Sequence, residues 1–152
     1  MNDAGFAPEA SDCALPSVND SFKTGFNMTL CGAFALQLAP RGYDVSAVNY
    51  GQLPKDLDAA LEGACPIIGS FGADDRSLKG AAAKLDAALD RLGVPHQVTE
   101  YAGASHAFLN PGPAGPTAVR WIMQRVGGFG PRPEQAELAW SRIDAFFADH
   151  LN

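Results

Sequence analysis

The chain has little charge and no long apolar run. Only 18% of its 152 residues are charged, below the quarter that is typical of soluble domains. Unbroken apolar runs are no longer than about that of Ala33–Leu36, whereas a membrane-spanning helix needs about 20 apolar residues. No transmembrane segment is therefore expected, and a 47% hydrophobic content excludes intrinsic disorder of the chain as a whole.

The sequence also lacks an excess of basic residues. Its 17 Asp and Glu outnumber 11 Lys and Arg, which gives a formal net charge of −6. This balance argues against nucleic acid or an anionic membrane as a partner and favours a small, neutral or weakly charged ligand. The first 13 residues contain Asp3, Glu9 and Asp12 but no basic residue and no apolar core, so no secretory signal is predicted and a cytoplasmic location is expected.

Cysteine is scarce and lacks the spacing of a metal site or a disulfide framework. The three cysteines, Cys13, Cys31 and Cys65, are an odd number in a chain of this length, and we interpret them as free thiols. The sequence accordingly predicts no metal site.

What the chain does contain is an alternation of strand and helix patterns within one domain. Residues 1–21 have no sustained period and are predicted to form an irregular leader, followed by a domain over 22–152. The expected strands are 22–30, 43–50, 65–71 and 96–101, and the expected helices are 31–39, 55–61, 77–92 and 132–151. Such alternation predicts an α/β fold, with a mostly parallel sheet and helices on both faces. The last helix carries an apolar stripe of Trp140, Ile143, Phe147 and Leu151.

Three segments are expected beyond the carboxyl ends of these strands, where α/β sheets place their functional groups. They are NMTLCG (27–32), GADDR (72–76) and GASHAF (103–108). Together they supply a Thr or a Cys, one of two Asp, and a His, which is the chain order of a nucleophile-elbow hydrolase. A fourth polar feature, His96, opens a strand without an evident partner.

Several stretches resemble the carboxyl-terminal half of the dienelactone hydrolase family. They are CPIIGSFGADDRSLKGAAAKLDAALDRLGVPHQVTEYAGASHAFLN, the preceding AVNYGQLP and the closing AWSRIDAFFADHL, and the similarity spans roughly residues 23–151. The resemblance implies an α/β-hydrolase that opens unsaturated lactones and cleaves related esters with a Cys-Asp-His triad. It implies no metal or organic cofactor.

The resemblance also assigns residues. It places the triad carboxylate at Asp75 and the base at His106. Residues 27–32 align with the family variant G-M-C-L-T-G, which puts Thr29 at the nucleophile position and Cys31 two residues later. Cys31 is slightly favoured, because a helix amino terminus stabilises a thiolate.

An oxyanion would be bound by the N–H group that follows the nucleophile. This is the N–H of Leu30 if Thr29 attacks, or that of Gly32 if Cys31 attacks.

The family fold has further strands before the elbow, and they have no counterpart in this sequence. We therefore expect a partial α/β-hydrolase fold that lacks the amino-terminal strands, with an exposed sheet edge that promotes homodimer formation. Two functions follow. The first is hydrolysis of a small ester or lactone through a nucleophile-His-Asp triad. The alternative is a truncated, non-catalytic binding or assembly module.

Overall fold

The computed structural model describes residues 28–110 and 130–151, with only the backbone described for residues 28–31. The predicted leader and the first part of the strand expected at 22–30 lie outside this range. The elements in chain order are α1 (Met28–Leu38), β1 (Ser46–Asn49), α2 (Leu57–Leu61), β2 (Ile67–Gly72), the 3₁₀ helix η2 (Arg76–Leu78), α3 (Ala81–Leu92), β3 (His96–Tyr101) and α5 (Pro133–His150).

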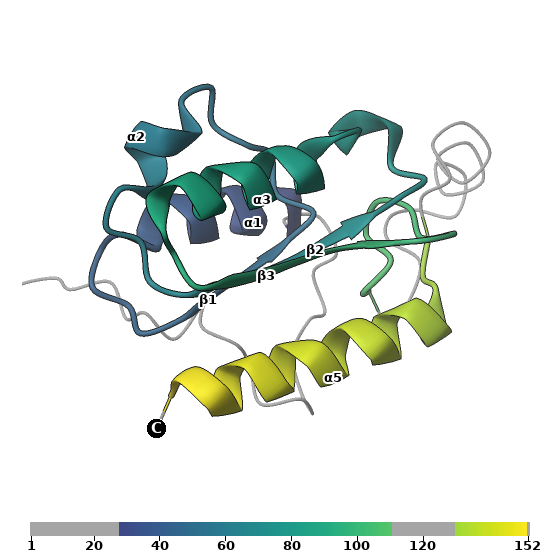
Figure 1. The fold of residues 1–152 in the computed structure, drawn as a ribbon. Coiled ribbons are helices and arrows are strands. Elements are labelled where there is room, and N and C mark those ends of the chain that lie inside the picture. Colours follow the sequence, from purple (N-terminus) through teal and green to yellow (C-terminus); the bar gives the residue numbers. More distant parts are fainter. Residues whose placement is uncertain (1–27, 111–129, 152) are drawn as a thin grey trace, which may run out of the picture.

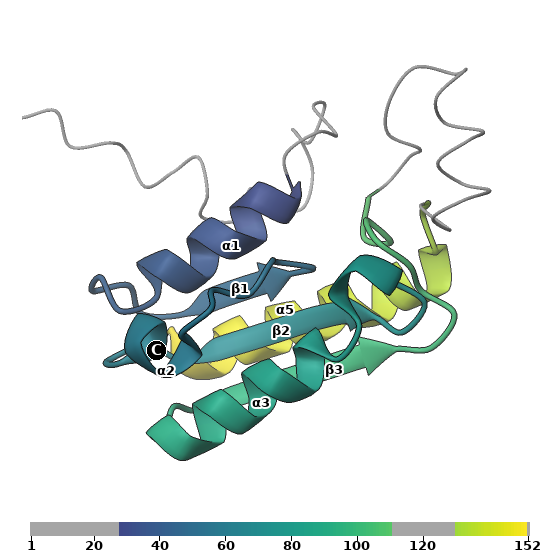
Figure 2. The ribbon, with the colours of Figure 1, turned by 90° about the horizontal axis from the view of Figure 1, so that it is seen from above.

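The three described strands form one parallel sheet in the order β1-β2-β3. Ser46 pairs with Ile67, and Ile67 pairs with His96, so the strands begin nearly level and end at the same edge. Helices α1 and α3 cover one face of the sheet and α5 covers the other (Figures 1 and 2). The predicted α/β class, with a parallel sheet between helices, is confirmed.

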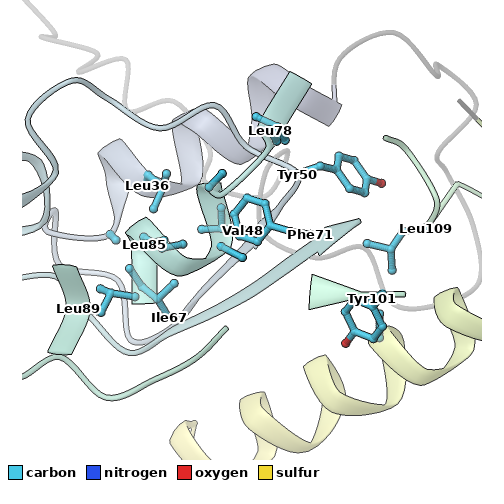
Figure 3. Close-up of a cluster of buried hydrophobic side chains, with 14 of the residues drawn as sticks. Leu36, Val48, Tyr50, Ile67, Phe71, Leu78, Leu85, Leu89, Tyr101 and Leu109 are labelled. Carbon is cyan, nitrogen blue, oxygen red and sulfur yellow. The ribbon is translucent and has the colours of Figure 1, made fainter. Parts of the chain in front are cut away.

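The alternation of side chains along β2 supplies a core to each face. Ile67 and Phe71 pack with Leu85 of α3 in the larger cluster, part of which Figure 3 shows. Ile68 points to the opposite face and packs with Ile143 of α5. The strand is buried along its whole length, as expected for a central strand that is covered on both faces.

Short local signals place most element boundaries. Asp56 caps α2 through a hydrogen bond from the Ala59 N–H, and Gly93 ends α3 in the left-handed conformation, at φ 65°. Pro133 occupies the first turn of α5, as predicted. Within residues 28–110 and 130–151, none of the helices combines the length and apolar character needed to cross a bilayer.

The expectations for residues 28–30 and for Leu151 were wrong. Residues 28–30 belong to helix α1 rather than to a strand, and Met and Leu at two of these positions are good helix formers. Leu151 is 56% exposed instead of completing the apolar stripe of the last helix. The helix ends at His150, so the stripe does not reach Leu151, and Phe146 is buried on this face.

Candidate active site

Asp75 lies just beyond the carboxyl end of the central strand β2. It is 3% exposed and caps the 3₁₀ helix η2 with an extended backbone. Its Oδ1 accepts two hydrogen bonds from Ser77, one from the backbone N–H at 2.9 Å and one from Oγ at 2.6 Å. These bonds fix the carboxylate plane and leave Oδ2 directed toward the segment that follows β3.

His106 comes from that segment and meets Asp75 directly. The imidazole Nδ1 lies 2.6 Å from Asp75 Oδ2, and both side chains are buried. An ionised carboxylate only accepts hydrogen bonds, so Nδ1 carries the proton and donates it. Nε2 is then the ring nitrogen that can take up a proton, which is the arrangement of a general base held by an acid.

The electrostatics of the pair favour an ionised Asp75. Burial by itself raises the pKa of this carboxyl, but the hydrogen bonds from His106 and Ser77 outweigh it, and the pKa lies below its ordinary value. The neighbouring Asp74 is exposed, and its backbone N–H donates to Ala104 O. Of the two acids in this turn, Asp75 is therefore the one that meets His106.

The loop that carries His106 is held against β2 by backbone contacts. A Cβ added at Gly72 would lie 2.6 Å from Ala104 O and 2.8 Å from Ser105 O, so only glycine fits there. Arg132, just before α5, closes the other side: its Nε donates to Gly103 O at 3.0 Å and its backbone N–H to Phe108 O at 3.1 Å. The loop is thus fixed both before and after His106.

Tyr50 contacts the imidazole from the end of β1. It is fully buried, its ring centroid lies 5.3 Å from that of His106, and its hydroxyl donates to Asn110 Oδ1 at 3.4 Å. Its φ of 40° is unusual for a non-glycine residue, and such strained backbone often occurs at functional sites. In Figure 3 the Tyr50 hydroxyl points away from the side chains of Val48 and Phe71.

The start of α1 approaches the same end of the sheet. Gly32 and Gly51 are in backbone contact, since a Cβ on Gly51 would lie 2.6 Å from the Gly32 carbonyl carbon. Gly51 directly follows Tyr50, so two successive contacts lead from the first turns of α1 to the His106 ring. Figure 2 shows the start of α1 on the side of the sheet to which the strands point.

The nucleophile candidates Thr29 and Cys31 both lie in α1, where the structure describes only their backbone. Leu30 and Gly32, whose N–H groups are the two candidate oxyanion donors, both lie in the first turns of α1.

Sequence reasoning missed three residues that support Asp75 and His106: Ser77, Tyr50 and Arg132. The spacing Asp-x-Ser at 75–77 signals a local side-chain turn and could have identified Ser77. Tyr50 follows a strand end, as do the other site residues, but nothing in the sequence signals its positive φ. Tyr101 and Phe108, on either side of His106 in the chain, are buried and in ring contact with each other.

The parallel sheet between helices, with an Asp–His pair beyond its strand ends, defines a partial α/β-hydrolase fold. Residues 21–151 match the model of the dienelactone hydrolase family, and the chain belongs to that family.

Two solved structures share the fold, each with a TM-score of 0.58. One is a dienelactone hydrolase candidate from Klebsiella pneumoniae subsp. pneumoniae MGH 78578, at 22% identity over 77% of this chain. The other is a dienelactone hydrolase-like promiscuous phosphotriesterase from metagenomic libraries, at 20% identity over 78% of this chain. The chain spans 48% of the length of each structure. A comparison with curated proteins gives no significant match.

Proposed function

We propose that the protein hydrolyses a small ester or lactone through a nucleophile at the start of α1, with His106 as general base and Asp75 as the carboxylate that orients it. The observation that carries this proposal is the buried 2.6 Å hydrogen bond between His106 Nδ1 and Asp75 Oδ2, located where α/β sheets place catalytic groups. Membership of the dienelactone hydrolase family supports it.

In the proposed reaction, the nucleophile attacks the carbonyl carbon while its proton passes to His106 Nε2. The ionised Asp75 stabilises the imidazolium that forms. Collapse of the tetrahedral intermediate expels the alkoxide, which takes the proton from His106, and leaves an acyl-enzyme. Water, deprotonated by His106, then attacks the acyl carbonyl and releases the acid and the nucleophile.

We favour Cys31 as the nucleophile, because a thiolate near a helix amino terminus is stabilised and is a strong nucleophile at neutral pH. Thr29 remains the alternative. Its case rests on the resemblance, which puts Thr29 at the nucleophile position and makes the following N–H, that of Leu30, the oxyanion donor.

The test is hydrolysis of a short activated ester by the purified chain and by His106→Ala, Cys31→Ala and Thr29→Ala. We expect His106→Ala and one of the two α1 variants to reduce turnover to background. Cys65→Ala is the matched control, because it also removes a thiol. Cys65 precedes the amino end of β2, and burial raises the pKa of its thiol. This variant should retain full turnover. Background rates in the wild-type chain would refute the proposal and favour the non-catalytic module.

Thiol labelling gives a second readout that does not depend on finding the substrate. If Cys31 is activated by His106, iodoacetamide labels it faster than Cys13 and Cys65, and His106→Ala slows the labelling of Cys31 alone. Equal labelling rates at the three cysteines would contradict the Cys31 assignment and leave Thr29.

We also propose that the chain forms a homodimer through the outer edge of β1. Among the residues described, β1 pairs only with β2, and an unpaired edge is a template for another strand. Light scattering coupled to size exclusion tests this, and a monomer at high concentration would refute it.

A further inference from the structure

The structure brings together three potential metal ligands far from the candidate active site. Asp86 and Asp90 lie one turn apart on α3, and His96 opens β3. His96 Nε2 is 3.2 Å from Asp86 Oδ1 and 3.8 Å from Asp90 Oδ1. His96 is at the amino end of its strand, whereas His106 follows the carboxyl end of the same strand.

The shorter of these two distances is close to that between two ligands of one small cation. Two ligand atoms that are each about 2.0–2.1 Å from a tetrahedral zinc ion are separated by about 3.3–3.4 Å. The three ligand atoms here all lie within 4.8 Å of one another. Binding would require the Asp90 carboxylate to move closer than its present 3.8 Å, and its side chain is 73% exposed.

The hydrogen bonding of His96 suits a cation at Nε2. Nδ1 lies 2.7 Å from the backbone carbonyl of Val94, which can only accept, so Nδ1 carries a proton. This carbonyl support on the second ring nitrogen is the usual arrangement of metal-bound histidines. Nε2 then faces two carboxylate oxygens, and its lone pair would repel them unless a positive charge lies between. A metal ion bound between them would supply that charge.

We propose that Asp86, Asp90 and His96 bind a divalent transition-metal ion of the zinc type, with water completing the coordination. One imidazole nitrogen and two carboxylate oxygens suit Zn²⁺, while Mg²⁺ and Ca²⁺ prefer oxygen ligands alone. The ion would join α3 to β3, and it lies at the opposite end of the sheet from Asp75 and His106. The site therefore stabilises the fold and takes no part in the proposed hydrolysis.

Calorimetric titration of the purified chain with ZnCl₂ tests the proposal. We expect one site that is lost in His96→Gln and weakened at least tenfold in Asp86→Asn. His150→Gln is the matched control, because His150 Nδ1 also contacts a backbone carbonyl, that of Phe146, at 2.8 Å, yet His150 belongs to no such ligand group among the residues described. It should bind Zn²⁺ as the wild type does, and MgCl₂ should give no saturable binding.

Thermal unfolding provides the second measurement. A ligand that binds only the folded state raises its stability, so ZnCl₂ should raise Tm in the wild type and in His150→Gln but not in His96→Gln or Asp86→Asn. Equal Zn²⁺ binding by wild type, His96→Gln and Asp86→Asn would overturn the proposal. So would a wild type without saturable Zn²⁺ binding.

Discussion

Replacement of Gly72 by alanine should displace His106 without unfolding the protein. The added Cβ would lie 2.6 Å from Ala104 O, and ordinary van der Waals contact begins near 3.4 Å, so a shift of about 0.8 Å is required. Gly72 ends the central strand, which is hydrogen-bonded to a neighbour on each side. The loop that carries His106 is therefore the part that moves.

The size of the effect follows from that displacement. A misplacement of about 1 Å in a catalytic group can reduce the rate about 10²-fold, so we expect kcat/KM for an activated ester to fall by about that factor in Gly72→Ala. Overpacking of this kind destabilises a fold by about 1–3 kcal/mol, which urea denaturation would measure. A rate loss much larger than the loss of folded protein would indicate a positional effect.

Gly69→Ala on the same strand is the control. The three atoms nearest its added Cβ would be side-chain atoms of Phe71 and Val98, at 3.2–3.3 Å, so the closest contacts involve no backbone atom. The downfield NMR resonance of the His106 Nδ1 proton reports the bond to Asp75 whether or not the chain is active. If Gly72→Ala kept both this resonance and the wild-type rate, the close backbone approach would not position His106.

Three further predictions concern stability. Asp75→Asn should lower the free energy of unfolding at pH 7, and urea denaturation should show this difference shrinking on acidification. The lowered pKa of Asp75 contributes stability that is present above the unfolded-state value of about 3.9 and is lost as the pH falls through the folded-state value. Tyr50→Phe removes the hydroxyl bond to Asn110 and should destabilise the fold by about 0.5–1.5 kcal/mol while leaving the His106 resonance in place. Leu85→Ala, in the larger core cluster, should destabilise the fold by about 2–5 kcal/mol. The His106 resonance should stay where it is in the wild type, and a shifted resonance would contradict this prediction.

The sequence was most informative where periodicity or a cap determines the structure. The strand expected at 96–101 has those bounds in the structure, because its alternating side chains lie between Gly93 and Gly103. The start of α1 was misplaced, since the apolar Met28 and Leu30 fit a buried strand as well as a helix. Boundaries of this kind depend on which backbone N–H and C=O groups find hydrogen-bond partners. The pattern of side chains along the sequence does not determine those partners.

The candidate site divides in the same way. Asp75 and His106 could be predicted to meet, because their segments follow neighbouring parallel strands that end at one edge. The support from Ser77, Tyr50 and Arg132 could not, because it depends on hydrogen bonds and a strained φ. His96 was interpreted as lacking a partner, because its two carboxylates lie on the preceding helix and only the packing of α3 on β3 brings them close.

The two groups of Asp and His side chains have different proposed roles. One is Asp75 with His106, and the other is Asp86 and Asp90 with His96. A buried carboxylate and imidazole gain little net stability, because desolvation offsets much of their attraction, yet Asp75 and His106 are both buried and each is fixed by further contacts. That arrangement suits a group that must hold one orientation during a reaction. Asp86 and Asp90, by contrast, are exposed carboxylates on a helix surface, where solvent screens a pairwise attraction and a bound divalent ion would add most of the energy. Loss of His106 should therefore abolish chemistry while leaving Zn²⁺ binding at His96 unchanged, and loss of His96 should do the reverse.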